Sequence, residues 1–180
     1  MTFRELIIKR RSRRVYTGVS LSEKVLTQIV EAGLLAPTGR NLHPAEVIVV
    51  RDKAMLERLA RAKTGGSTLI AGADAALVVI GDTVRSDTWV EDASIMMAYM
   101  QLEAEALGVG NCWVQIRSRQ SQDVDAAGST MSSNDYVRQA LEIPEPYEVL
   151  AILALGMSEE ARPPHTAEDI DHSHWRNERF

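Results

Sequence analysis

The longest helix candidate in the chain, residues 92–107, carries two apolar stripes instead of one. Each apolar stripe of a helix needs cover, so two stripes require cover on more than one side. A chain of 180 residues suits one ordinary domain, so a second subunit could supply part of this cover, or one subunit could bury the whole helix. One stripe contains Ala93, Met96, Met97, Met100, Ala104 and Leu107, and the other contains Ile95, Ala98, Tyr99, Leu102 and Ala106.

The rest of the chain alternates helical and extended patterns around this helix. Thr2 and Glu5, and again Ser20 and Glu23, have the spacing of a capping box, which predicts two helix starts. The almost wholly apolar run 75–80 is expected to be a strand that is covered on both faces. The pattern predicts an α/β or α+β domain with helices on both sides of a sheet. Other helices are predicted from Asp52 to before Gly65 and at 135–141, and other strands at 47–50, 111–116 and 148–155.

Two segments are too polar to form a core of their own. Residues 117–133 contain few apolar side chains and are predicted to be a mobile loop or an insertion. Residues 157–180 are expected to be an extension that wraps over the rest of a single domain spanning 1–180. The acidic and histidine side chains of this extension could suggest a metal site, but we interpret them as a solvated tail and predict no metal: Glu168, Asp169, His172 and His174.

The overall charge and the cysteine count exclude several classes of protein. The chain has 20 basic and 25 acidic residues, a net charge of −5, whereas a general nucleic-acid binder is usually basic. Its one cysteine, Cys112, cannot form an intramolecular disulfide and is expected to be a small buried hydrophobe. No apolar run approaches the roughly 20 residues that cross a bilayer, and Arg4 and Glu5 interrupt any secretory signal. We therefore expect a cytoplasmic protein whose partners include neither membrane nor nucleic acid.

One local feature contradicts the acidic composition, because Lys9–Arg14 places five cations within six residues. This basic cluster has four interpretations: a solvated helix end, a mitochondrial presequence, a nucleic-acid contact, or a site for a ligand phosphate. Glu5 disfavours the presequence, and the net charge disfavours the nucleic acid. Arginine binds phosphate oxygens bidentately, and Ser12 adds a hydroxyl at the same place. The cluster alone does not decide between the solvated end and the phosphate site.

Further motifs follow the basic cluster in a fixed order. In this order and spacing they resemble the nitroreductase family of FMN-dependent oxidoreductases, in particular its small members. The resemblance covers nearly the whole chain. It implies an α+β fold with helices around a mixed, mainly antiparallel sheet, and an intertwined homodimer with two FMN sites at the interface. The motifs are Lys9–Tyr16, Ala36–Pro44, Trp89–Asp92, Ala106–Trp113, Ile143–Tyr147 and Leu153–Gly156.

The resemblance also implies which residues hold the cofactor. One group matches the family positions for the FMN phosphate and ribityl chain, a second matches a loop that approaches the flavin from the other subunit, and a third lies beside the isoalloxazine ring. Lys9 and Arg13 are expected to point elsewhere, into solvent. The first group is Arg10, Arg11, Ser12 and Arg14, with Arg162 of the tail near the phosphate; the second is Pro37, Thr38, Gly39 and Asn41; the third is Val109, Gly110 and Asn111.

The implied activity is a ping-pong reaction in which NADH or NADPH gives a hydride to flavin N5 and a small organic acceptor then takes the reducing equivalents. No side-chain acid or base is expected to be catalytic. The alternatives are other flavin chemistry of the family, such as dehalogenation, dehydrogenation or flavin breakdown, and a non-catalytic flavin-binding protein. Two departures from the family pattern stand out: His43-Pro44-Ala45 replaces Gln-Pro-Trp, and Ser67 and Thr68 stand where an amide side chain often contacts the flavin.

Overall fold

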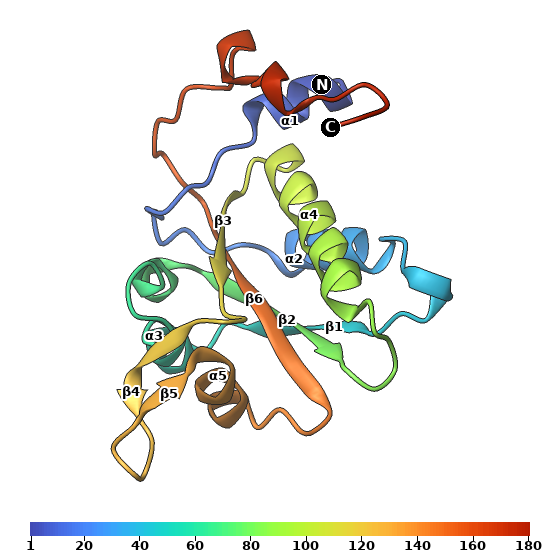
Figure 1. Ribbon diagram of the computed structural model, residues 1–180. Coiled ribbons are helices and arrows are strands. Elements are labelled where there is room, and N and C mark those ends of the chain that lie inside the picture. Colours follow the sequence, from blue (N-terminus) through green and yellow to red (C-terminus); the bar gives the residue numbers. More distant parts are fainter.

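A four-stranded sheet lies at the centre of the computed structural model, which describes all 180 residues (Figure 1). The strand order is β1–β2–β6–β3, and a separate two-stranded hairpin, β4–β5, projects from one end. The strands are β1 (Ala45–Val50), β2 (Ala75–Asp82), β3 (Gly110–Gln115), β4 (Gln120–Val124), β5 (Thr130–Ser132) and β6 (Tyr147–Gly156), and the helices are α1 (Phe3–Lys9), α2 (Glu23–Leu34), α3 (Lys53–Leu59), α4 (Trp89–Ala106) and α5 (Ser133–Leu141).

All three strand pairs of the central sheet are antiparallel. Strand β3 forms one edge, and the only backbone pairing beyond it is a parallel bridge between Ser12 and Asn111. This bridge attaches the basic cluster to the sheet and makes the pairing mixed but mainly antiparallel, as predicted.

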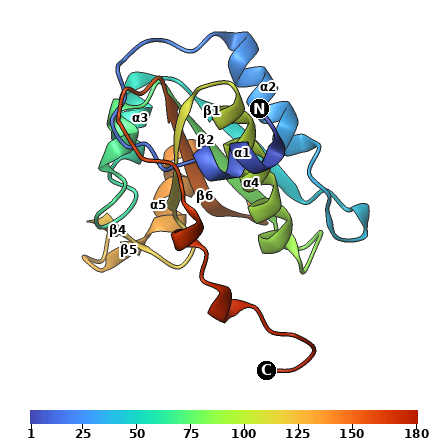
Figure 2. The ribbon, with the colours of Figure 1, turned by 90° about the horizontal axis from the view of Figure 1, so that it is seen from above.

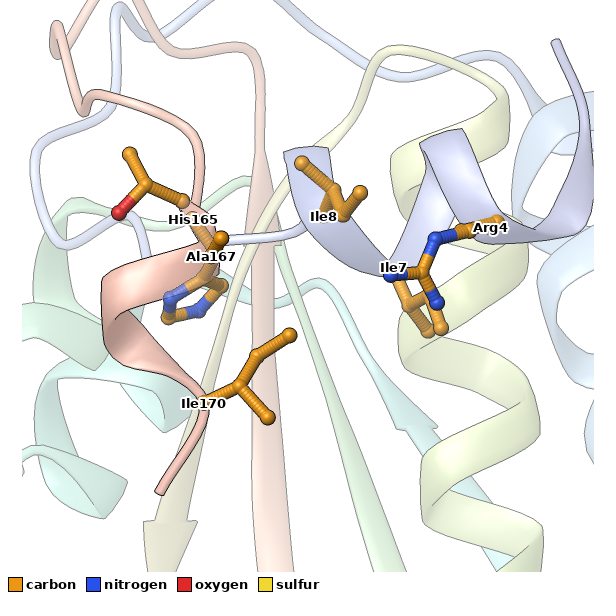
Figure 3. A pocket seen from close by; sticks show the side chains of 7 residues that line it. Arg4, Ile7, Ile8, His165, Ala167 and Ile170 are labelled. Atoms are coloured by element: carbon orange, nitrogen blue, oxygen red, sulfur yellow. The ribbon is translucent and has the colours of Figure 1, made fainter. Parts of the chain in front are cut away.

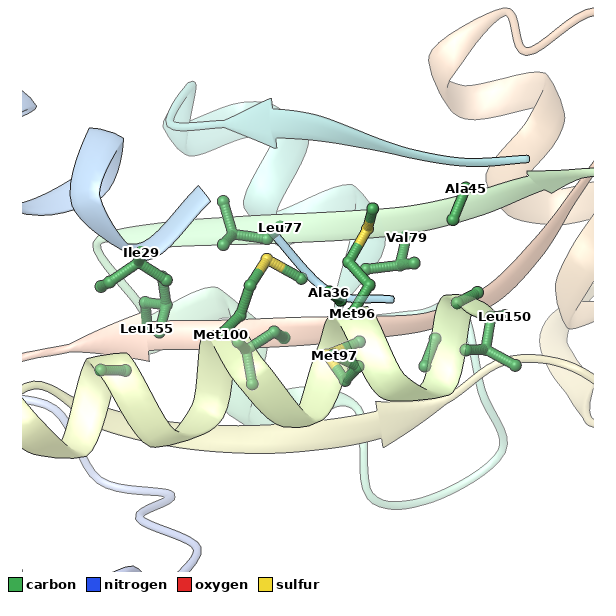
Figure 4. Close-up of a cluster of buried hydrophobic side chains, with 14 of the residues drawn as sticks. Ile29, Ala36, Ala45, Leu77, Val79, Met96, Met97, Met100, Leu150 and Leu155 are labelled. Carbon is green, nitrogen blue, oxygen red and sulfur yellow. The ribbon is translucent and has the colours of Figure 1, made fainter. Parts of the chain in front are cut away.

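Helices cover both faces of the sheet and create two separate cores. Along β2, Leu77 and Val79 face α2 and α4, whereas Val78 and Ile80 face α3 and α5. This alternation explains why the β2 sequence is continuously apolar, and it confirms the expectation that both faces of the strand are covered. Figure 4 shows the first core, in which Met96, Met97 and Met100 of α4 pack against Leu77, Val79 and Leu155 of the sheet.

Helix α4 buries one of its two apolar stripes and leaves the other open. In the inner stripe, Ala93, Met97, Met100 and Ala104 are fully buried. In the outer stripe, Ile95 is 37% exposed and Tyr99 is 41% exposed. The alternative in which one subunit buries the whole helix is therefore wrong.

The helix starts follow local capping chemistry, with one correction. Thr2 and Glu5 form the predicted capping box of α1. The predicted capping box of Ser20 and Glu23 is wrong, because α2 begins two residues later with Ser22 as its N-cap. The Ser20 hydroxyl instead donates to Asp74, which also accepts the backbone N–H of Leu21 at 2.9 Å.

The prediction of a mobile loop at residues 117–133 is also wrong, because this segment contains the β4–β5 hairpin. A turn that ends in Gly128 joins its strands, and the Asp125 side chain accepts the backbone N–H groups of Ala127 and Ser129. Backbone hydrogen bonds from Thr64 to Gln120 and from Gln122 to Arg61 fix the hairpin to the segment after α3. A polar ribbon of this kind needs no apolar alternation, so its sequence resembles that of a loop.

None of the helices combines the length and the hydrophobicity that crossing a lipid bilayer requires.

Substituting Met97 with alanine should lower the free energy of unfolding by about 2–5 kcal/mol, because Met97 is fully buried between α4 and the sheet. Urea titration followed by circular dichroism measures this change. Val84, which is 82% exposed, is the matched control, and Val84→Ala should stay within about 0.5 kcal/mol of the wild type. Equal effects of the two substitutions would contradict the packing described for α4.

Candidate functional site

The N-terminal segment 8–17 and the tail segment 157–165 run side by side, although about 150 residues separate them in sequence (Figure 1). The backbone N–H of Thr17 donates to Met157 O at 2.9 Å, and that of His165 donates to Ile8 O at 2.9 Å. These two hydrogen bonds lie at opposite ends of the paired region. The basic cluster is therefore held between the sheet edge and the tail.

Glu160 is the main polar link between the two segments. Its carboxylate accepts the backbone N–H of Arg14 at 2.6 Å and that of Val15 at 3.3 Å, and it also pairs with the Arg162 guanidinium. The Arg14 N–H above all, with Arg162, lowers the pKa of the Glu160 carboxyl below its usual value. Arg13 Nη1 donates to the backbone O of Glu160 at 2.9 Å, so the predicted solvated position of Arg13 is wrong.

A cavity of about 210 Å³ opens between the basic cluster and the tail. Neither a carboxylate nor an apolar side chain lines it. Four guanidinium groups around one small space repel each other, so the cavity is complementary to a compact anion with several oxygens. Its lining brings together all the residues predicted for the phosphate, and adds one histidine: Arg10, Arg11, Ser12, Arg14, Arg162 and His165.

The start of β3 is hydrogen-bonded to the basic cluster. The backbone O of Asn111 accepts the N–H of Arg13 at 2.9 Å, and the Asn111 side chain is fully buried and directed towards Gln101. A Cβ atom at Gly110 would lie 2.7 Å from Ser158 Cβ and 3.0 Å from the backbone O of Gly156. Only glycine allows the tail to cross β3 this closely.

The loop with the remaining predicted residues, 37–41, lies at the other end of α4. The backbone N–H of Gly39 donates to the buried carboxylate of Asp92 at 2.7 Å, and a Cβ atom at Gly39 would lie 2.6 Å from Thr88 Oγ1. Thr88 therefore leaves no room for a side chain at position 39, and this position requires glycine. Asn41 and His43 have positive φ angles of 57° and 48°, and their side chains contact each other at 2.9 Å.

The two groups of predicted residues do not meet within one chain. The loop contacts the first turn of α4, whereas Val109 and the basic cluster lie at its last turn. An 18-residue helix is about 27 Å long. The chain therefore carries two groups of candidate site residues at opposite ends of the helix whose outer stripe is exposed.

Comparison with known proteins decides the family. The model of the nitroreductase family matches residues 7–77 and 61–157. A protein of Archaeoglobus fulgidus, provisionally named NADH dehydrogenase/NAD(P)H nitroreductase, is 32% identical over 169 residues, which cover 92% of this chain and 90% of the relative. The chain belongs to the nitroreductase family.

Solved structures of this family have the same fold. An FMN-dependent nitroreductase of Clostridium difficile superposes with a TM-score of 0.90 at 36% identity and covers 97% of this chain and 98% of its own. A nitroreductase-like protein of Desulfovibrio desulfuricans, solved in complex with FMN, superposes with a TM-score of 0.74 at 24% identity and covers 98% and 96% of the two chains. The chain therefore has the fold of this oxidoreductase family.

A second polar cavity of about 170 Å³ lies beside the basic cluster and shares no lining residue with the first. Lys9 and Arg13 line it with Glu105, Val109 and Gly110, so these two side chains of the cluster do not line the first cavity. Glu105 is only 5% exposed, and its burial raises the pKa of its carboxyl against the opposing influence of Arg13, Lys9 and Arg10. Glu105 was not predicted as a site residue from the sequence. It lies on the inner side of α4, where a buried side chain is expected.

Tyr16 is another supporting residue that the motif contained but the sequence did not single out. Its hydroxyl donates to the backbone O of Arg13 at 2.9 Å and of Ala154 at 3.2 Å, and burial raises the pKa of the phenol. Cys112 is buried as predicted, and burial raises the pKa of its thiol. These two side chains pack the cluster against the sheet and do not line the 210 Å³ cavity.

Strand β3 offers an open edge next to the basic cluster. Because Asn111 O accepts from Arg13, the backbone groups of Trp113 and Gln115, two and four residues further on, face the same outer side. No strand pairs with them there. An unpaired edge of this kind is a row of hydrogen-bond donors and acceptors that continues along β3 beyond the predicted segment 109–111.

The remaining candidates have local roles. Ser67 is fully buried, and its hydroxyl donates to Ala60 O at 2.7 Å, so it closes the turn after α3, whereas Thr68 is exposed. In the tail, no three His, Cys, Asp or Glu side chains gather as metal ligands. Trp175 is 71% exposed, and Figure 2 shows the last residues extending away from the rest of the chain.

Replacing Gly110 with alanine should destabilise the protein by about 1–3 kcal/mol, because the added methyl group overlaps Ser158 and pushes the tail off β3. Thermal unfolding measures the loss, and limited proteolysis should cut the tail faster. The control is Gly72→Ala, where a Cβ atom would meet nothing within 4 Å. A wild-type melting temperature for Gly110→Ala would refute the close crossing.

Proposed function

We propose that this chain is an FMN-dependent oxidoreductase that reduces a small organic acceptor with NADH or NADPH in a ping-pong reaction. The observation that carries the proposal is the cationic cavity, in which two segments from opposite ends of the chain place four arginines around one space. Its donors fit a phosphate monoester, because guanidinium groups and a hydroxyl bind phosphate oxygens and no carboxylate opposes them. The FMN-dependent relative from Clostridium difficile supports the same assignment.

The residues of the chain would divide the work of holding the cofactor. Arg10, Arg11, Arg14 and Arg162 would neutralise the phosphate, and Ser12 would donate to it or to the ribityl chain. The open β3 edge and the segment 109–111 would orient the ring through backbone groups. When bound, FMN would supply the hydride chemistry at N5, so the chain needs no acid or base of its own.

We further infer that two copies of the chain complete each site. The exposed outer stripe of α4 borders an apolar groove of about 300 Å³, lined by residues that include Phe3, Leu6, Tyr99 and Leu102. A two-fold axis across α4 would place the helix of a second copy antiparallel to the first. The loop at the first turn of one α4 would then lie beside the basic cluster at the last turn of the other. Pro37, Thr38, Gly39 and Asn41 would thereby reach the cofactor of the partner.

The purified protein should be yellow and should release FMN on denaturation. Under anaerobic conditions, NADH or NADPH should bleach the absorbance near 450 nm, and an added quinone or nitro compound should restore it. A bound flavin that neither nucleotide reduces would contradict the proposed reaction and favour a non-catalytic flavin protein. Restoration by a different acceptor class would identify other chemistry of the family.

Two double variants test this assignment. Each removes two arginines, one pair at the cavity and the other pair far from it. Arg10→Ala with Arg14→Ala should weaken FMN binding about tenfold or more, because each arginine contributes a charged hydrogen bond. Arg58→Ala with Arg119→Ala removes two exposed arginines far from the cavity and should leave the FMN dissociation constant unchanged. Equal FMN content in the two double variants would overturn the assignment of the basic cluster.

A charge on the outer stripe of α4 should separate the proposed dimer. Tyr99→Glu places a carboxylate on the apolar face, so light scattering after gel filtration should show a monomer, and FMN content should fall with it. Val124→Glu, at an exposed hairpin position, is the control that should stay dimeric and yellow. A folded Tyr99→Glu variant that remains a dimer with full FMN content would exclude this interface.

A further inference from the structure

His165 lies in the wall between two cavities. On one side it lines the 210 Å³ cationic cavity with the arginines, and on the other it lines an apolar groove of about 360 Å³ between α1 and the tail. Figure 3 shows this groove, with Ile8 of α1 facing Ile170 of the tail and the His165 ring beside them. The hydrogen bond from His165 N to Ile8 O fixes the backbone at this point.

One nitrogen of the His165 ring is already engaged. His165 Nδ1 lies 3.4 Å from Asp169 Oδ2, one turn further along the tail. The Asp169 carboxylate is itself held by the backbone N–H of Thr166 at 2.7 Å, and this hydrogen bond, with smaller contributions from His165 and Arg11, lowers the pKa of Asp169. A carboxylate beside Nδ1 fixes the orientation of the ring. Nε2 is then the ring nitrogen left to serve the cavity.

The tail contains a second pair of the same type outside the 210 Å³ cavity, in a more open cavity that Arg4 and Arg176 also line. His174 Nε2 lies 3.6 Å from Asp171 Oδ2, and the His174 side chain is 85% exposed. The His165 side chain is 39% exposed. The two pairs share chemistry and differ in location, so a role specific to His165 can be separated from a general role of tail histidines.

We propose that His165, oriented by Asp169, binds the phosphate of the bound flavin and makes the site select the phosphorylated flavin over riboflavin. The cavity around it presents Arg10, Arg11, Arg14 and Arg162, which favour the dianion, and Asp169 is the acidic group facing the ring. An N–H at Nε2 would donate to a phosphate oxygen while Nδ1 keeps its contact with Asp169. This inference rests on the proposed function, because it names a further residue of the same site.

The test compares the binding of FMN and riboflavin to the full-length protein after removal of its flavin. His165→Gln should raise the FMN dissociation constant about tenfold, the loss expected for one charged hydrogen bond, and should leave the riboflavin constant unchanged. Asp169→Asn should change the FMN constant in the same direction by a smaller factor. His174→Gln is the matched control and should change neither constant.

The outcomes separate this inference from the proposed function. If the wild type prefers FMN to riboflavin and His165→Gln keeps the same preference, His165 has no phosphate role while the proposed cofactor stands. If His165→Gln weakens both flavins equally, its effect is structural and the inference is overturned. If the wild type binds neither flavin, both proposals fall.

Discussion

Helix α4 can bury only one of its two apolar stripes within its own chain, and the rest of the architecture follows from this constraint. Its inner stripe supplies the methionines that fill the core above the sheet. Its first turn holds the loop at Gly39 through Asp92, and its last turn leads into the strand that supports the basic cluster. The same helix therefore organises the core, separates the two groups of candidate site residues and leaves an apolar face for which the chain has no cover.

The cationic cavity depends on contacts between residues that are distant in sequence. Mutual repulsion of the arginines opposes their gathering, and carboxylates placed just outside the cavity offset it. Glu160 pairs with Arg162 and with the backbone of the cluster, Glu105 lies buried behind Arg13, and Asp169 lies beside His165. None of these carboxylates lines the cavity itself. Arg11 donates to Pro163 O and Arg162 pairs with Glu160, so the arrangement keeps the cluster in place while leaving the guanidinium groups of Arg10 and Arg14 free for an anion.

The sequence predicted those parts of the molecule that depend on local patterns. The stripes of α4, the apolar alternation hidden in β2 and the arginine motif each carry their own signal. The hairpin at 120–132 lacked one, because its polar strands are stabilised by backbone pairing. The N-cap at Ser22 was missed because Asp74, which draws Ser20 away, lies on another element. Glu105 was left out for the same reason: its importance comes from the residues that the fold brings beside it.

The loop at the far end of α4 has a backbone conformation that bears on the proposed dimeric site. Three of its side-chain-bearing residues, Arg40, Asn41 and His43, adopt positive φ angles, a conformation that costs free energy and is typical of functional loops. Asp92 and Thr38 hold this conformation in the isolated chain, so the loop is already shaped before any ligand arrives. A site completed by such a loop from a partner links cofactor binding to association, because a ligand that binds only the dimer stabilises the dimer by mass action. The basic cluster and the outer face of α4 look like separate features of the sequence. Under this arrangement, both contribute to the free energy of forming the cofactor-bound dimer.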